Sequence, residues 1–429
     1  MLSAIAFLSF FITASVLAFV RGPIFGLVAY IGVFYIHPPA RWWGQGILLN
    51  VRWSLIAAGV TLLAIWLRRE KQEGRTSFFR QKFVVGFLLF IAWALVQSFW
   101  ALDIVSHREL ISYYLKFLIA MYLIYSCVDS VRNLRIFLYT HVAGCLYLGY
   151  VAFTTAAGGR FEGFGSPGIS EANAGALQIV TGILVAAALF LASGKWGKAF
   201  VVGAMPFIVN ALATTISRSG FLAFTIGGLI FNFFTPTKLR RRVVTLSVVG
   251  VVLLVMLTDA SYWNRIQTIK YRGQEVEGVE TGAGRLEIIR QQWRMFELHP
   301  LGCGHMCTTY LSPIYLPDAL TEGGRASHNT FMTMLVDHGV PGAIFYIALA
   351  WFIYSRLREL ENFYRRTDGF LPTVYPAVAG ILGAIFVADL FVQYPKLEVR
   401  FWFIAILMAM HQMMLIDKST SGSEVFVDK

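Results

Sequence analysis

Long apolar stretches separated by short polar connectors run through this chain of 429 residues. A helix that crosses a membrane needs roughly 20 apolar residues, and most of the apolar stretches approach that length. The candidate spans fall near residues 2–20, 23–36, 53–67, 83–102, 110–127, 135–156, 174–193, 199–215, 220–234, 243–258, 339–355, 374–393 and 401–416. Several are short, so we expect twelve or thirteen crossings. The pattern predicts an all-α, polytopic integral membrane protein of about a dozen transmembrane helices.

Lysine and arginine are concentrated in alternate connectors. The basic connectors are 68–82, 132–135, 195–198, 238–242 and 356–366, and counting spans between them puts all five on one side. By the positive-inside rule that side is the cytoplasm, whereas the connectors at 157–173 and 217–219 face outward. We therefore divide the chain into spans over 1–258, a large periplasmic loop over 259–338, further spans over 339–416 and a cytoplasmic tail over 417–429. The side of the N-terminus stays open.

The outer loop over 259–338 is the one segment of soluble size, and we expect it to be partly helical. Leu286, Ile289, Trp293 and Phe296 recur at helical spacing, which predicts an amphipathic helix over 285–297. A second helix is predicted from Asn329 to Val336.

We expect Ser327 to be the N-cap of that second helix. His328 would then lie in its first turn, where the helix dipole disfavours the charged imidazolium. A neutral imidazole in this position can accept a proton from a hydroxyl group.

Composition agrees with a membrane protein. Charged residues make up only 14% of the chain, against about 25% in soluble domains. The net charge of +12 follows the basic connectors, so it does not indicate nucleic acid. The sequence contains no HExxH, no P-loop and no GxSxG motif, so nothing specifies a metal or a nucleotide. Cys303 and Cys307 could form a disulfide if their loop is periplasmic.

Several arginines lie on the predicted outer side, where the positive-inside rule disfavours them. Arg218 is the sharpest case, because Thr214–Gly220 offers almost no polar loop around it. A charge near mid-bilayer costs about 2.5–3.5 kcal/mol on insertion scales. Arg218 could snorkel or pair with Asp389, but we favour a role as a donor to a phosphate at the membrane surface. Lys116 lies near the outer end of its span and is either paired or lines an outward cavity.

The residues around the outer loop resemble the O-antigen ligase and polymerase superfamily. His328-Asn329, nine further residues and Gly339-Val340-Pro341-Gly342 match the ligase pattern His-[Asn/Ser/Gln]-x9-Gly-x-x-Gly. Gly284-Arg285-Leu286, Trp293 and His299–Gly304 resemble the family's loop helix and its ending, and Ser217–Gly220 resembles its arginine turn. The early stretch with His37-Pro38-Pro39 also resembles the exosortase-associated O-glycosylation ligases, a branch of the same superfamily.

The resemblance implies a glycosyltransferase C-like enzyme that moves a glycan from undecaprenyl diphosphate to lipid A–core without metal, nucleotide or cofactor. It would work in the bacterial inner membrane with its active site facing the periplasm. His328 would be the base, and Arg218 and Arg265 would stabilise charge on the leaving diphosphate. The substrate-binding residues would be Arg160, Arg285, Arg325, Lys116 and Asn329. We expect Arg218, Arg265 and His328 to converge.

Other functions remain open at this stage. An O-antigen polymerase would use another lipid-linked glycan as acceptor, and a protein O-glycosylation ligase would use a protein. A transporter of lipid-linked sugars would need charged residues along a path through the membrane, whereas this chain concentrates them at the outer face.

Overall fold

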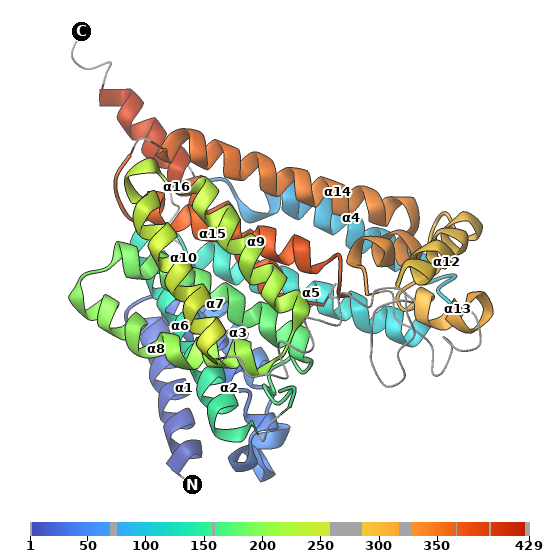
Figure 1. Cartoon of the computed structure of the whole chain (residues 1–429), viewed down its shortest axis with the longest axis horizontal. Coiled ribbons are helices and arrows are strands. Elements are labelled where there is room, and N and C mark those ends of the chain that lie inside the picture. The colour runs from blue at the N-terminus through green and yellow to red at the C-terminus, as the bar shows by residue number, and fades with distance from the viewer. Residues whose placement is uncertain are drawn as a thin grey trace.

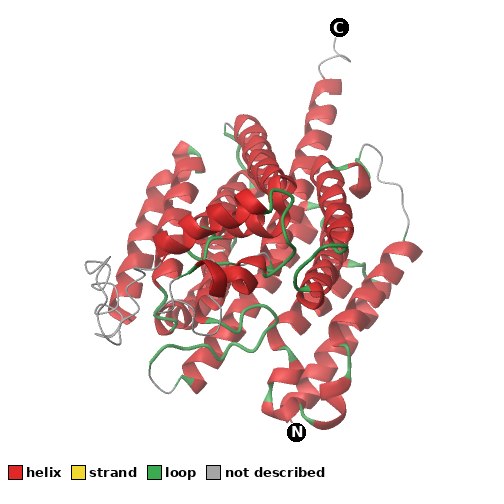
Figure 2. Cartoon of the chain, turned by 90° about the vertical axis from the view of Figure 1, so that its right-hand side faces the viewer, coloured by secondary structure: helices red, strands yellow, loops and turns green. Residues whose placement is uncertain are grey.

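The computed structural model describes residues 2–68, 75–156, 159–257, 285–316, 328–365, 367–393 and 396–424. All regular secondary structure in these residues is helical (Figure 2), which confirms the all-α class. The first seven helices are α1 (Leu2–Val20), α2 (Ile24–Ile36), α3 (Trp53–Leu67), α4 (Lys82–Gln97), α5 (Ile104–Cys127), α6 (Val131–Thr155) and α7 (Ala172–Ala192). They are followed by α8 (Lys195–Thr214), α9 (Arg218–Phe234), α10 (Thr237–Leu257), α12 (Arg285–Leu298), α13 (Cys307–Tyr315), α14 (Thr330–Tyr364), α15 (Phe370–Ala388) and α16 (Glu398–Glu424).

Each predicted span overlaps one of these helices, although α4 ends at Gln97 and α15 at Ala388, before the predicted ends at 102 and 393. Within the described residues, eight helices are long and apolar enough to cross a membrane, and four further apolar helices are shorter. The chain is therefore a multi-pass membrane protein. Of the first two predicted spans, whose full crossing the sequence left open, α1 is among the eight long helices and α2 among the shorter ones.

Helices α7, α15 and α16 form the most buried part of the bundle. Helix α9 packs closely on α15, because glycines at the contact allow the two backbones to approach. A Cβ atom added to Gly227 would lie 3.0 Å from the carbonyl oxygen of Gly380. At the far end of this pair the hydroxyl of Tyr375 donates to the carbonyl of Phe234 over 2.7 Å. The antiparallel packing puts the start of α9 and the end of α15 at the same end of the bundle.

The basic connectors gather at the opposite end. Arg75 donates to the carbonyl of Tyr125, Lys238 pairs with Asp368 at 2.9 Å, and Arg135 lies 4.6 Å from the ring centre of Phe370. The C-terminus leaves the bundle near this end, at the upper left of Figure 1. These contacts support the prediction that the basic connectors share one side, and its assignment to the cytoplasm rests on the positive-inside rule.

Helix α14 has a kink that the sequence pattern did not predict. Gly339 has φ 67° and ψ −158° inside it, so the helix changes direction between its first turns and its long apolar part. The first turns pack with the end of α4 and with α12 and α13, at the right of Figure 1.

The predicted amphipathic helix exists as α12, and Phe296 of the four predicted apolar residues packs on a buried cluster, but the most buried residues of the helix are others. Ile288, Gln292 and Met295 are buried, whereas Trp293 is 51% exposed. Gln292 donates to the hydroxyl of Thr308 over 3.0 Å, and Met295 joins a small apolar cluster with residues of α13 and α14. The contacts with α13 and α14 therefore select a different face from the one that apolar spacing alone favoured.

Candidate functional site

Four connectors meet where α9 begins and α15 ends: the described residues of 159–171, 215–217, 328–329 and 389–397. We call this group the mouth. The N–H of Phe161 donates to the carbonyl of Thr214 over 2.9 Å, which joins the first two connectors. The backbone at Gly168 lies against the carbonyl of Lys396, since an added Cβ would be 3.5 Å from that oxygen. The mouth thus joins segments far apart in the sequence.

Arg218 is the first residue of α9 and is partly buried at the mouth. Ser217 is the N-cap: its hydroxyl accepts from the N–H of Gly220 at 3.0 Å and donates to Asn173 at 2.7 Å. The N-terminal end of a helix carries a partial positive charge and unpaired N–H groups. A guanidinium placed there adds a full charge, and the combination suits an anion.

Asp389 does not pair with Arg218. Its carboxylate instead binds Arg400 at 2.5 Å and accepts from the hydroxyl of Tyr346 at 2.7 Å. Both members of the ion pair are buried, at 1% and 5% exposure. Sequence reasoning missed Arg400, although an arginine directly before the apolar span 401–416 was a visible signal.

His328 lies just outside α14, not in its first turn as predicted. The N-cap is Asn329, whose side chain accepts from the N–H of Met332 at 2.9 Å. Thr330 begins the helix: its N–H donates to the carbonyl of Asp389 at 2.7 Å and its hydroxyl to that of Val392 at 2.8 Å. The predicted cap, Ser327, lies outside the described residues.

The backbone of His328 adopts φ 49°, a conformation that residues with a side chain seldom take. Its side chain is exposed at the mouth. Such backbone outliers cost of order 1–3 kcal/mol and are concentrated at functional sites. The conformation agrees with a functional role for this histidine.

Of the other predicted site residues, some are described by the structure and some are not. Arg160 pairs with Glu162 at 3.4 Å, and the bond from its neighbour Phe161 to Thr214 brings it beside the turn that precedes Arg218. Lys116 lies 5.0 Å from the ring centre of Tyr113 on α5. Outside the described residues lie Arg265, Arg325 and the side chain of Arg285.

Sequence reasoning also missed Lys396. Its ammonium lies 5.1 Å from the same Tyr113 ring and 3.8 Å from Glu109. The connector after α15 is short and has little periodicity, so only its tertiary contacts, with Gly168 and with α5, reveal this lysine.

A buried polar junction holds the outer loop against the bundle, beside the kink of α14. It consists of Gln97, His107, His305, Asp337 and His338, all at most 3% exposed. Gln97 donates to the carbonyls of Leu301 and Asp337 and accepts from His338 at 2.8 Å. These bonds join α4, α14 and the segment before α13. Within the described residues, no group of His, Cys, Asp or Glu is arranged to hold a metal ion.

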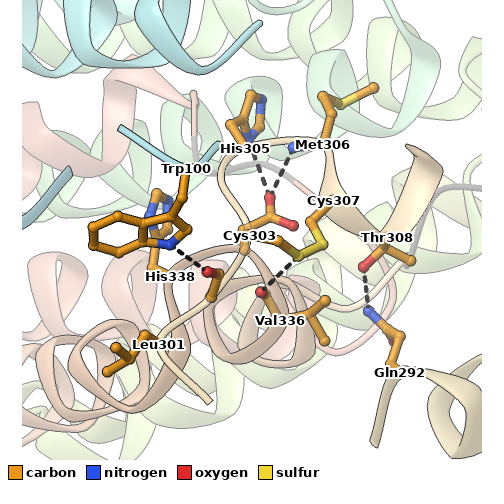
Figure 3. Close-up of a disulfide and its surroundings, with 12 residues drawn as sticks. Trp100, Gln292, Leu301, Cys303, His305, Met306, Cys307, Thr308, Val336 and His338 are labelled. Atoms are coloured by element: carbon orange, nitrogen blue, oxygen red, sulfur yellow. Dashed lines mark hydrogen bonds and ion pairs between the residues drawn. A yellow bond between two sulfur atoms is a disulfide. The ribbon is translucent and has the colours of Figure 1, made fainter. Parts of the chain in front are cut away.

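The segment from His299 to Cys307 is fixed to this junction (Figure 3). Asp337 accepts from the N–H of Met306 at 3.1 Å and lies 3.2 Å from His305. Cys303 and Cys307 form a disulfide, as the sequence allowed. The indole of Trp100 donates to the carbonyl of Gly302 at 2.9 Å.

The glycines of the sequence motifs meet at this junction. A Cβ atom on Gly339 would lie 2.4 Å from the carbonyl oxygen of Pro300. One on Gly302 would lie 2.5 Å from the carbonyl oxygen of Asp337. Both glycines also have positive φ, which favours a residue without a side chain. The two motifs therefore serve to dock the loop on the kinked helix.

Part of the chain matches a known family. Residues 203–347 match the model of a family described as O-antigen ligase. The matched region contains Arg218, the outer loop, His328 and the glycines of the kink. No curated protein matches the chain.

Proposed function

We propose that this chain is an O-antigen ligase, because its residues 203–347 match the model of that family. It transfers a glycan from undecaprenyl diphosphate to lipid A–core at the periplasmic face of the bacterial inner membrane. One observation carries the proposal. The N-terminal end of α9 with Arg218 and the segment with His328 both belong to the mouth, and the second is attached to the end of α15, against which α9 packs.

The donor leaves behind a diphosphate whose lipid tail stays in the membrane. Arg218 and the first N–H groups of α9 are suited to stabilise the charge that develops on it. Arg160, beside the same turn, supplies a second cation. A hydrogen bond to a charged group contributes about 1.5–3 kcal/mol. Arg265 remains a further candidate for this role.

The acceptor hydroxyl attacks the anomeric carbon as the bond from that carbon to the diphosphate oxygen breaks. His328 takes the hydroxyl proton, a contribution of about 10²–10⁴ in rate. The lipid diphosphate is already a good leaving group, so the step needs no general acid, metal or nucleotide. A single displacement of this kind inverts the anomeric configuration.

The test is a transfer assay with purified protein, lipid-linked glycan and lipid A–core, in EDTA and without nucleotide. We expect an upward shift of the core band on a gel for wild type. His328→Ala and Arg218→Ala should abolish it. Arg218→Lys should recover little activity, because an ammonium cannot reproduce the planar fork of guanidinium donors. Arg240→Ala, which removes an exposed arginine at the opposite end, is the matched control.

Each rival function has its own outcome in this assay. Lengthening of the lipid-linked glycan itself, with no shift of the core band, would establish a polymerase. Glycan found on an added protein acceptor would establish a protein O-glycosylation ligase. Movement of intact donor across vesicles, without any transfer, would establish a transporter.

A further inference from the structure

A second cationic cluster lies at the mouth, on the face of α5. Glu109, Tyr113 and Lys116 follow one another at spacings of four and three residues, which puts them on one side of the helix. Lys396 reaches the same tyrosine from the segment between α15 and α16. The two ammonium groups lie 5.0 and 5.1 Å from the ring centre of Tyr113, so both are held beside one aromatic ring.

The charges in this cluster do not balance. Glu109 is the carboxylate that pairs with Lys396, at 3.8 Å, and both side chains are partly exposed, at 56% and 33%. Lys116 pairs with no carboxylate among the described residues, and its ammonium contacts the ring alone. An aromatic face attracts cations but does not neutralise them. The cluster therefore keeps an excess positive charge that suits an anion.

Exposed apolar side chains lie beside the cluster on α5. Leu115 and Ile119, on either side of Lys116 along α5, are each 45% exposed, as expected for side chains that face lipid. Phe117 stacks on Phe401 at 4.8 Å, so this part of α5 is level with the first turn of α16. Lys116, next to Phe117 in the middle of α5, therefore lies level with the beginning of α16.

We propose that Lys116, Lys396 and Tyr113 form a binding site for a phosphate group on a lipid that enters the mouth sideways from the membrane. The lysines bind the phosphate as point charges, and the tyrosine ring holds them in place. Because Gly168 contacts the Lys396 carbonyl, the site adjoins the connector that carries Arg160 but uses different side chains from the Arg218 site. Two cationic sites suit a reaction between two anionic lipids.

The identity of that lipid rests on the proposed function: it is the acceptor, whose lipid A part carries phosphates. Diphosphate of the donor then occupies the Arg218 site, and the acceptor's phosphate occupies the lysine site. The acceptor hydroxyl approaches the mouth from the α5 side.

Binding can be tested without turnover. The purified protein is titrated with bisphosphorylated lipid A and with the same lipid stripped of phosphate, and retention is read by native mass spectrometry. We expect wild type to prefer the phosphorylated form about tenfold or more, and the double variant Lys116→Gln/Lys396→Gln to lose that preference. Lys198→Gln is the matched control, because Lys198 also lies over a ring, 5.6 Å from that of Phe190, on a different helix.

Further variants and a competing lipid test the same proposal. Glu109→Gln removes the counter-charge of Lys396 and should strengthen the preference, and a double Lys→Arg variant should keep it. If the double Gln variant still prefers phosphate, the site is wrong. Competition by phosphatidylglycerol as strong as by bisphosphorylated lipid A would overturn the assignment to the acceptor.

The transfer assay distinguishes a failure of the proposed lipid site from a failure of the proposed reaction. In the transfer assay, the double Gln variant should raise the KM for lipid A–core about tenfold and leave the KM for the donor unchanged. A rise in the donor KM instead would overturn the assignment. If wild type binds the phosphorylated lipid but transfers no glycan, the ligase proposal fails and the lipid site stands.

Discussion

The N–H of Thr330 donates a hydrogen bond to the carbonyl oxygen of Asp389 over 2.7 Å. This bond fixes the start of α14, and with it His328, to the end of α15. Helix α15 packs along α9, which begins at Arg218. The relative position of the proposed base and the proposed diphosphate ligand therefore depends on how firmly Asp389 is held.

Removing one member of the buried pair of Asp389 and Arg400 should destabilise the protein more than replacing both members by apolar residues. Asp389→Ala removes the carboxylate that binds the buried guanidinium of Arg400, and breaking a buried ion pair from one side typically costs about 3–5 kcal/mol. The double variant Asp389→Leu/Arg400→Met removes both charges and should be markedly more stable than the single one. Thermal unfolding in detergent, followed by tryptophan fluorescence, measures the difference. A double variant no more stable than Asp389→Ala would contradict this account.

Asn329 was predicted to bind substrate, and in the structure it caps α14. Asn329→Ala should lower stability by about 0.5–2 kcal/mol and reduce transfer, because His328 loses its anchor. Asn329→Asp keeps an oxygen in the capping position and should restore both properties. Unfolding curves and the transfer assay give the two readouts. Should Asn329→Asp be stable yet inactive, the amide would have the substrate-binding role.

The glycines of the kink should tolerate no side chain. In Gly342→Ala the new Cβ would lie 2.3 Å from the carbonyl oxygen of Met334, and in Gly339→Ala 2.4 Å from that of Pro300. Both variants should yield less folded protein and lower unfolding temperatures. Gly228→Ala is the control, since nothing lies within 4 Å of its added Cβ. Size-exclusion chromatography and thermal unfolding would reveal the contrast, and an unfolding temperature for Gly342→Ala equal to that of Gly228→Ala would refute it.

The disulfide between Cys303 and Cys307 should prevent alkylation of these two cysteines in the native protein. Cys303 and Cys307 are both buried, and so are the two free cysteines. Alkylation without reductant should therefore label no cysteine, and reduction with partial unfolding should expose Cys303 and Cys307. For so short a loop, Cys303→Ser/Cys307→Ser should cost about 2 kcal/mol by chain entropy. Peptide mass spectrometry reads the labelling. Labelling of Cys303 in the untreated protein would show that the bond does not form.

Local features of the mouth were only partly predictable. Arg218 stood out because almost no polar loop surrounds it, and His328 stood out because it was expected at the start of a helix and matches the ligase pattern. Lys396 did not, since nothing in its own segment marks it, and Arg400 was missed although it directly precedes an apolar span. Lys396 contacts Tyr113, which is far away in the sequence. Arg400 binds Asp389, which follows a different helix. Both pairs therefore exist only after the helices have packed.

The buried face of α12 and the cap of α14 show the same limit. The spacing of apolar residues identifies a helix but not the helices that will pack against it. In α12 the packing against α13 and α14 buries the face with Ile288 and Met295. Ser327 and Asn329 are both good capping residues, and the bonds from Thr330 to the end of α15 decided between them.

The sequence by itself determined that this is an all-α membrane protein, where its helices lie and which motifs relate it to a family. Those properties follow from the length of apolar stretches and from residue types at short spacing, which act locally. Only the tertiary structure decided that Asp389 binds Arg400 and that Lys116 and Lys396 share one ring. It also decided that the motif glycines dock the loop on a kink in α14. These relations depend on helix packing, where close backbone contacts and buried charges must be satisfied by partners far along the chain.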